Sequence, residues 1–206
     1  MSRAACIEEL RADPEDPGLV HLRVGDAWIG PVRRDTAQAM RLAEGRRWTA
    51  AIAGKVQAEV AALACRADAL RRLGRRDLTR ALLAARLATR WGEAAAERAV
   101  SELAAAGWLD DRAYASRRAE QLQDRSPVAP ELLQARLEQE GVTERDARRA
   151  AESAFDPAAL HRQVLAWKRE GRDGGWMARR LGRQGFDLDT IAAALQKARV
   201  PCDFDT

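Results

Sequence analysis

A recurring pattern of short helical segments is the feature that most constrains this fold. Between positions 49 and 199, amphipathic stretches are separated by glycine or proline. Ala-Arg-Leu at 85–87, Ala-Arg-Leu at 135–137 and Arg-Arg-Leu at 179–181 follow one another at intervals of 50 and then 44 residues. Similar segments at such intervals predict stacked helical units. Because helices this short cannot bury their apolar stripes alone, each unit must cover its neighbour.

We therefore expect a mainly α fold of tandem three-helix repeats in a curved, elongated body, with a small N-terminal β-hairpin and helix. The glycine and proline breaks divide the chain into five expected segments. These are the N-terminal hairpin and short helix (1–48), three repeats (49–108, 109–155 and 156–199) and a tail (200–206).

The first 48 residues differ from the rest because they contain a strand pattern. Apolar and polar residues alternate within 19–24, Gly25-Asp26 favours a tight turn, and 27–32 returns as a second strand. A third strand is expected around 7–11. A lone hairpin is marginally stable in water, so this element must pack against another. A short helix is expected after it, capped by Asp35 and running to Leu42.

Composition limits the kinds of partner and the cellular environment that this chain is expected to have. The formal net charge is +4, and 32 of the 35 basic residues are arginine. This excess is consistent with a nucleic-acid or acidic protein partner, and equally with a GC-rich genome. The three cysteines show no metal-ligand or disulfide spacing, which favours a reduced, cytoplasmic environment without a metal or cofactor. An acidic N-terminus argues against a signal peptide, and no apolar run reaches the ~20 residues that span a membrane.

No catalytic constellation is present, so we expect no enzyme activity. His21 and His161 lie in unrelated segments without a matching acid or nucleophile. The paired carboxylates Asp110 and Asp111 are better explained as a helix N-cap than as a metal or acid–base pair. The six tryptophans, Trp108 and Trp176 among them, are expected to fill the core between helices.

Arginine clusters are the candidate partner-binding and nucleic-acid-binding residues. They are Arg71, Arg72, Arg75, Arg76, Arg80, Arg117, Arg118, Arg179, Arg180 and Arg183. Each cluster has two explanations: a solvated helix face, or a stripe that contacts phosphates or an acidic protein. The two are evenly balanced for the first cluster, and the solvated face is the simpler explanation elsewhere, including Arg148 and Arg149.

Three motifs together resemble the RecX family over about residues 7–197. The first, at 70–80, is an apolar helix end followed by Arg-Arg-Asp and a threonine. The second, at 103–115, is a glycine and an apolar residue before Leu-Asp-Asp and an aromatic-Ala pair. The third, at 183–187, is the closing Gly-Phe turn. The structural motif residues are Leu109, Asp110, Asp111, Tyr114, Ala115, Gly185 and Phe186.

The resemblance implies a monomeric regulator of recombination and repair in the SOS response. RecX-like proteins bind the RecA–DNA filament and damp its ATPase and strand exchange. Contacts with single- or double-stranded DNA are expected to be weak and mainly through phosphates. The chain departs from the family pattern at Trp91-Gly92, where Gly-Phe is usual, and at Gly141-Val142. Two alternatives stay open: a helix-turn-helix-like DNA-binding regulator that acts without RecA, and a helical protein–protein adaptor.

Overall fold

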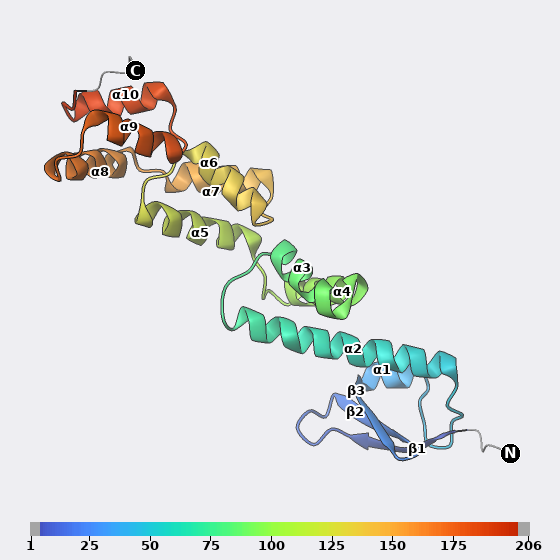
Figure 1. The fold of residues 1–206 in the computed structure, drawn as a ribbon. Helices are drawn as coiled ribbons and strands as arrows, with labels where there is room; N and C mark the ends of the chain where they lie inside the picture. The colour runs from blue at the N-terminus through green and yellow to red at the C-terminus, as the bar shows by residue number, and fades with distance from the viewer. Residues whose placement is uncertain (1–4, 202–206) are drawn as a thin grey trace. The chain divides into compact units, whose positions relative to one another are not determined.

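A three-stranded sheet followed by ten helices makes up residues 5–201, the part of the chain described by the computed structural model (Figure 1). The strands are β1 (Ile7–Ala12), β2 (Leu19–Val24) and β3 (Ala27–Arg33). The helices are α1 (Arg34–Ala39), α2 (Ala50–Leu73), α3 (Arg80–Trp91), α4 (Glu93–Ala105), α5 (Asp111–Arg125), α6 (Pro130–Gln139), α7 (Glu144–Ala154), α8 (Pro157–Arg169), α9 (Gly174–Arg183) and α10 (Leu188–Lys197). The mainly helical fold with a small N-terminal β element is as expected.

The sheet is antiparallel in the order β1-β2-β3, so the expected hairpin and third strand are both present. Alternation along β2 buries Val20 and Leu22, which share an apolar cluster with Val56 of α2. The expected helix capped by Asp35 and running to Leu42 is wrong at both ends, because α1 already begins at Arg34 and Asp35 lies within its first turn. Helix α1 ends at Ala39 because the chain turns there, and Arg41 takes a positive φ of 52°.

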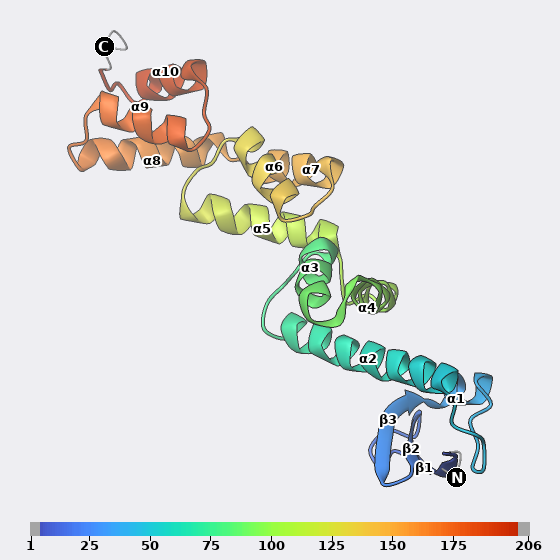
Figure 2. The same cartoon turned by 45° about the vertical axis from the view of Figure 1, so that its right-hand side comes forward.

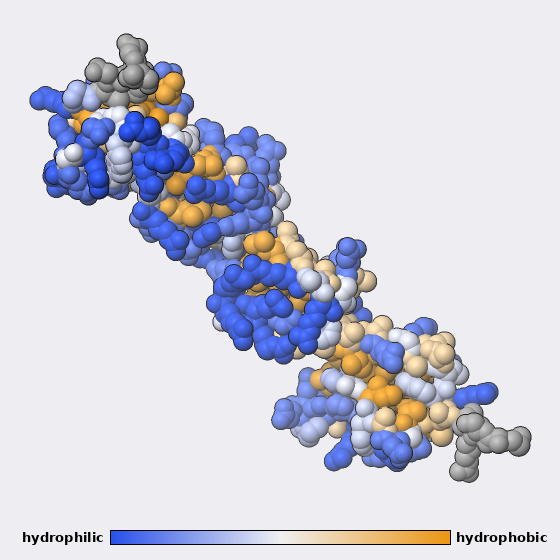
Figure 3. Space-filling model, viewed as in Figure 1, coloured by the Kyte–Doolittle hydropathy of each residue, from blue (hydrophilic) through white to orange (hydrophobic). Residues whose placement is uncertain are grey.

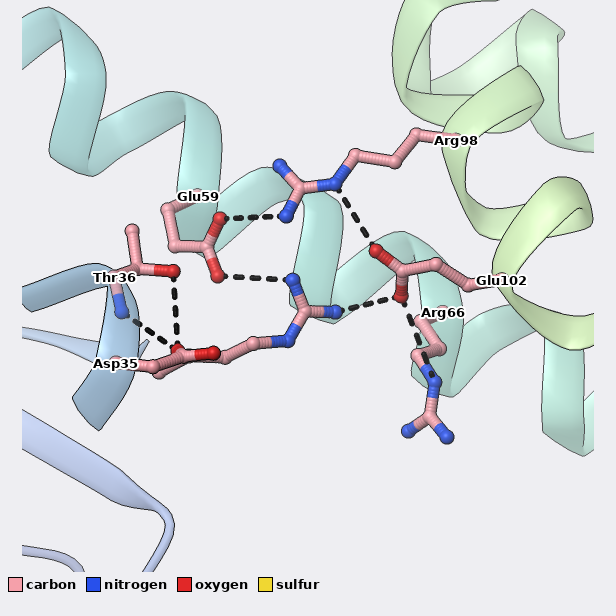
Figure 4. A network of polar contacts seen from close by, with 7 residues as sticks. Asp35, Thr36, Glu59, Arg66, Arg98 and Glu102 are labelled. Atoms are coloured by element: carbon pink, nitrogen blue, oxygen red, sulfur yellow. Dashed lines mark hydrogen bonds and ion pairs between the residues drawn. The ribbon is translucent and has the colours of Figure 1, made fainter. Parts of the chain in front are cut away.

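Charged residues join this sheet to the helices that follow it. Glu59 of α2 is only 3% exposed, and its carboxylate pairs with Arg33 of β3 and Arg98 of α4, each at 3.1 Å. Both arginines also contact Glu102, at 2.7 and 3.1 Å (Figure 4). Because a buried carboxylate without partners is costly, this network fixes the sheet against α2 and α4.

The later helices form two triplets, each with its own apolar core. Helices α5–α7 enclose one cluster that includes Leu133 and Leu137, and α8–α10 enclose another that includes Met177 and Leu181. Within each triplet the helices lie side by side in both views (Figures 1 and 2). N-cap side chains define the helix starts. The side chains of Thr143, Asp156, Asp173 and Asp187 each accept a hydrogen bond from a backbone N–H of the first turn.

The residue before α3 and the residue before α6 each donate a hydrogen bond to a later helix-ending turn. The Thr79 hydroxyl donates to the carbonyl of Glu140 at 2.5 Å, and the Ala129 N–H donates to the carbonyl of Gln184 at 2.9 Å. In both cases the acceptor lies directly before a glycine with positive φ, 84° at Gly141 and 88° at Gly185.

Those glycines permit the close approach. A Cβ at Gly141 would lie 2.3 Å from the Cβ of Ala81, and one at Gly185 would lie 2.6 Å from the Cβ of Leu132. Each helix-ending turn therefore packs against the start of an earlier helix, and only glycine fits.

Contacts divide the chain into two compact units. One comprises the described residues up to Asp77 together with Leu83–Trp108, and the other comprises Leu78–Leu82 together with the described residues from Leu109 onward. The first turn of α3 thus belongs with the second unit. The five expected segment boundaries and the expected curvature stay predictions, and most of the expected tail, including Cys202, lies outside the described residues.

We predict that Gly141→Ala destabilises the protein far more than Gly171→Ala. Both glycines have positive φ, so both substitutions carry a backbone cost of about 1–2 kcal/mol. Only at Gly141 does the added methyl meet another helix, which adds about 1–3 kcal/mol of overpacking, whereas Gly171 faces open space. Urea unfolding followed by circular dichroism measures the difference. Equal midpoints for the two variants would show that the turn does not need this close approach.

Candidate partner-binding site

In the first arginine cluster, at the end of α2, two arginines pair with a buried acid. Asp68 is 7% exposed and accepts from Arg71 at 3.4 Å, Arg72 at 3.3 Å and the Trp91 indole at 3.2 Å. Burial alone would raise the pKa of Asp68, but hydrogen bonds from Trp91 and Arg72 and the charges of both arginines outweigh it and lower the pKa. Arg72 in particular is half-buried and acts within the fold.

Arg75 and Arg76 are the members of this cluster that are available to bind a partner. Both lie exposed in the turn after α2, and no acid in the described part of the chain pairs with either. Arg80 is exposed as well, but its backbone N–H donates to Asp111 at 3.0 Å and its guanidinium lies 4.0 Å from the same carboxylate. A partner would therefore meet Arg75 and Arg76 as unpaired cations.

The Leu-Asp-Asp motif has a structural role, as expected. Asp110 caps α5 by accepting the Ala113 N–H at 2.9 Å, which confirms the cap interpretation. Asp111 instead caps the start of α3 through the Arg80 N–H. Leu109 and Ala115 are buried, 3% and 1% exposed. Two adjacent carboxylates thus cap the N-termini of two different helices.

Glu140 contacts one motif residue, Tyr114, and one candidate binding residue, Arg118. Its carboxylate accepts from the Tyr114 hydroxyl at 2.7 Å and from both Nε and Nη2 of Arg118, the latter at 2.8 Å. Burial alone would raise the pKa of Glu140, but the bonds from Arg118 and Tyr114 and the Arg118 charge outweigh it and lower the pKa. Arg118 is therefore committed inside the fold.

The last cluster lies on α9. Arg179, Arg180 and Arg183 are all exposed. In the turn that follows, Gln184 and Phe186 are buried and Gly185 is exposed. In the view of Figure 3, hydrophilic residues predominate over α8–α10. Among the predicted binding residues, Arg75 and Arg76 in one unit and the three α9 arginines in the other are exposed without an ion pair in the described chain.

Some features of the structure were not predicted from the sequence. The Glu59 network joins residues far apart in the chain, and no local pattern announces it. Trp108 is 60% exposed and Trp28 48%, so the expectation that the tryptophans fill the core is wrong for these two. Trp108 sits in the turn between α4 and α5, outside any helix packing face.

The described chain contains no group of three or more histidine, cysteine, aspartate or glutamate side chains arranged to hold a metal. Among the described helices, none has the length and apolar character needed to cross a bilayer.

Known proteins similar to this chain include several named RecX. No family model matches. Two curated relatives named Regulatory protein RecX, from two strains of Thermus thermophilus, are each 39% identical over 133 residues, which is 65% of this chain and 91% of the relative.

Two solved structures share the fold. A crystal structure of regulatory protein RecX matches with a TM-score of 0.64 and 17% identity, covering 95% of this chain and 92% of that one. The structure of RecX from Lactobacillus salivarius matches with a TM-score of 0.58 and 17% identity, covering 68% and 97%.

The Glu140 cluster makes a pH-dependent prediction. Glu140→Gln removes a carboxylate whose pKa is lowered on folding, so its stabilisation exists above the unfolded pKa of about 4.3 and disappears as pH falls through the folded value. At pH 7 the variant should lose about 1–2 kcal/mol, and the deficit should shrink steadily below pH 4.5. Urea midpoints measured across pH test this, with exposed Glu120→Gln of α5 as the matched control. A deficit independent of pH would contradict the ionic role of Glu140.

Proposed function

Because this chain belongs to the RecX family of regulatory proteins, we propose that it binds the RecA–DNA filament and inhibits RecA ATPase and strand exchange. The observation that carries the proposal is the family relationship, with 39% identity over 91% of each curated relative. The motif residues at 109–115 support it, because they hold the helices together as a shared scaffold.

Binding rather than chemistry is the proposed mode of action. Arg75 and Arg76 offer planar guanidinium groups that suit the carboxylates of an acidic protein surface or DNA phosphates. A multi-helix protein that contacts several RecA subunits gains affinity from many weak contacts, since the second contact is made at high effective concentration. The proposal includes a monomer that acts in the cytoplasm during recombination and the SOS response.

A DNA-binding regulator that acts without RecA is the alternative, and the exposed α9 arginines favour it. Such a protein would alter RecA activity only by competing for DNA. Its effect on ATP turnover would vanish when DNA is in large excess, whereas a filament-bound inhibitor would still act.

Titration of the protein into RecA on single-stranded DNA tests the proposal. We expect ATP turnover to fall, and we expect Arg75→Glu/Arg76→Glu to need about tenfold more protein for half-inhibition, roughly 0.7 kcal/mol for each lost contact. The matched control is Arg148→Glu/Arg149→Glu on α7, which changes the net charge equally at two exposed positions.

Unchanged ATP turnover at several-fold molar excess of the unmodified chain would refute the proposed function. Equal loss in the control variant would instead show that overall charge, and not the turn after α2, governs inhibition.

A further inference from the structure

Helices α3, α6 and α9 are equivalent in their pattern of buried residues. Each buries two apolar residues four positions apart, and all six side chains are 0% exposed: Leu83 and Leu87, Leu133 and Leu137, Met177 and Leu181. Four residues after the second buried side chain the chain reaches the turn that ends the helix. The helices can therefore be compared position by position, and the comparison separates what the fold requires from what it does not.

Two arginines of α9 have no counterpart in the equivalent helices. Where α9 has Arg179, the other two helices have alanine, Ala85 and Ala135; where it has Arg183, they have Thr89 and Gln139. Arg180 differs, since Arg86 and Arg136 stand at the same position. An arginine at the Arg180 position is a shared feature of the repeat, but those at 179 and 183 are not needed to form this helix.

The outer surface of α9 carries arginine and nothing apolar. Its exposed residues are Arg179, Arg180, Gly182 and Arg183, and no acid in the described chain pairs with these arginines. Arg179 and Arg183 lie one helical turn apart, a rise of about 6 Å, and so project from the same side. We call these three arginines the α9 face.

Nearby acids are already engaged elsewhere. The Asp173 carboxylate caps α9 by accepting the Trp176 N–H at 2.7 Å. Glu170 lies 3.9 Å from Arg172, whose guanidinium also stacks over the Trp176 ring at 5.0 Å. The α9 face therefore keeps its positive charge.

The helix dipole accounts for only part of this pattern. Arg180 and Arg183 lie in the last turn of α9, where a cation is favourable. Arg179 lies outside that turn, and α6 ends without a basic residue at the position of Arg183. Dipole stabilisation alone does not require this arrangement.

We propose that the α9 face binds the phosphodiester backbone of DNA. Guanidinium forks one turn apart match successive phosphates in a linear array. Protein interfaces are built around a core depleted in charge and rich in aromatic or apolar anchors, which this face lacks. The inference deepens the proposed function by assigning its DNA contact, but it is tested without RecA, so the two can fail separately.

The test uses the full chain and fluorescence anisotropy with labelled oligothymidine and, in a second arm, a labelled duplex. The variant Arg179→Ala/Arg183→Gln installs the residues that α6 carries at those positions, so the helix should still form. The control is Arg148→Ala/Arg149→Gln on α7, with the same loss of charge. Circular dichroism melting checks that all three proteins are folded.

We expect the α9 variant to bind about tenfold more weakly at about 50 mM salt, while the control stays close to the unmodified protein. Losing two phosphate contacts should also make the log–log salt dependence shallower by about 1.4 for single strands or 1.8 for duplex. The arm that shows the full change in slope identifies the form of DNA bound.

Three results would overturn the proposal: no DNA binding by the unmodified chain, unchanged salt dependence in the α9 variant, or equal losses in the control. Displacement of DNA by polyglutamate at matched charge would also overturn it and point to an acidic protein partner.

Discussion

The contact between a helix-ending glycine turn and the start of an earlier helix is the interaction on which this architecture depends. It occurs twice, at Gly141 and at Gly185, with a hydrogen bond to the carbonyl before each glycine. The bond satisfies a backbone acceptor that the end of a helix leaves without a partner. The acceptor is the same kind of carbonyl each time, whereas the donor is the Thr79 hydroxyl in one contact and the Ala129 N–H in the other.

Acids that are paired within the fold decide which arginines are left for a partner. Glu59, Asp68 and Glu140 are each held by at least one arginine, and removing a partner would leave an uncompensated charge in the fold. Arg72 and Arg118 belong to this internal set although their sequence clusters resemble binding surfaces. An excess of arginine is therefore a poor guide to a site until the ion pairs are known.

Local signals in the sequence can indicate a helix start, because a cap acts within one turn. Thr49 caps α2, and Asp187 caps α10, as their sequence positions indicate. Long-range pairs could not be predicted in this way. Thr79 meets Glu140, and Arg33 meets Glu102, across 61 and 69 residues, and neither pair carries a periodic signature.

The motif at 109–115 lies between these cases. Its sequence suggested a cap, and Asp110 is one, but nothing local showed that Asp111 would cap α3. The exposure of Trp108 was missed for a related reason: bulk at a segment border favours packing only if a neighbour's surface reaches it. Which of two adjacent residues turns inward depends on the helix that packs there.

The departure of the first triplet from the family's closing turn follows from the same contact. Gly141 and Gly185 combine a positive φ with a close neighbour, whereas Gly92 has a φ of 79° and open space around its Cβ position. The position aligned with Gly141 is Trp91, whose indole donates to Asp68 within the same unit. In the part of the chain that the structure describes, the sheet and α1 precede α2, so no helix start of an earlier triplet meets this turn. A side chain that fastens α3 to α2 replaces the glycine, and the turn keeps only its role in ending the helix.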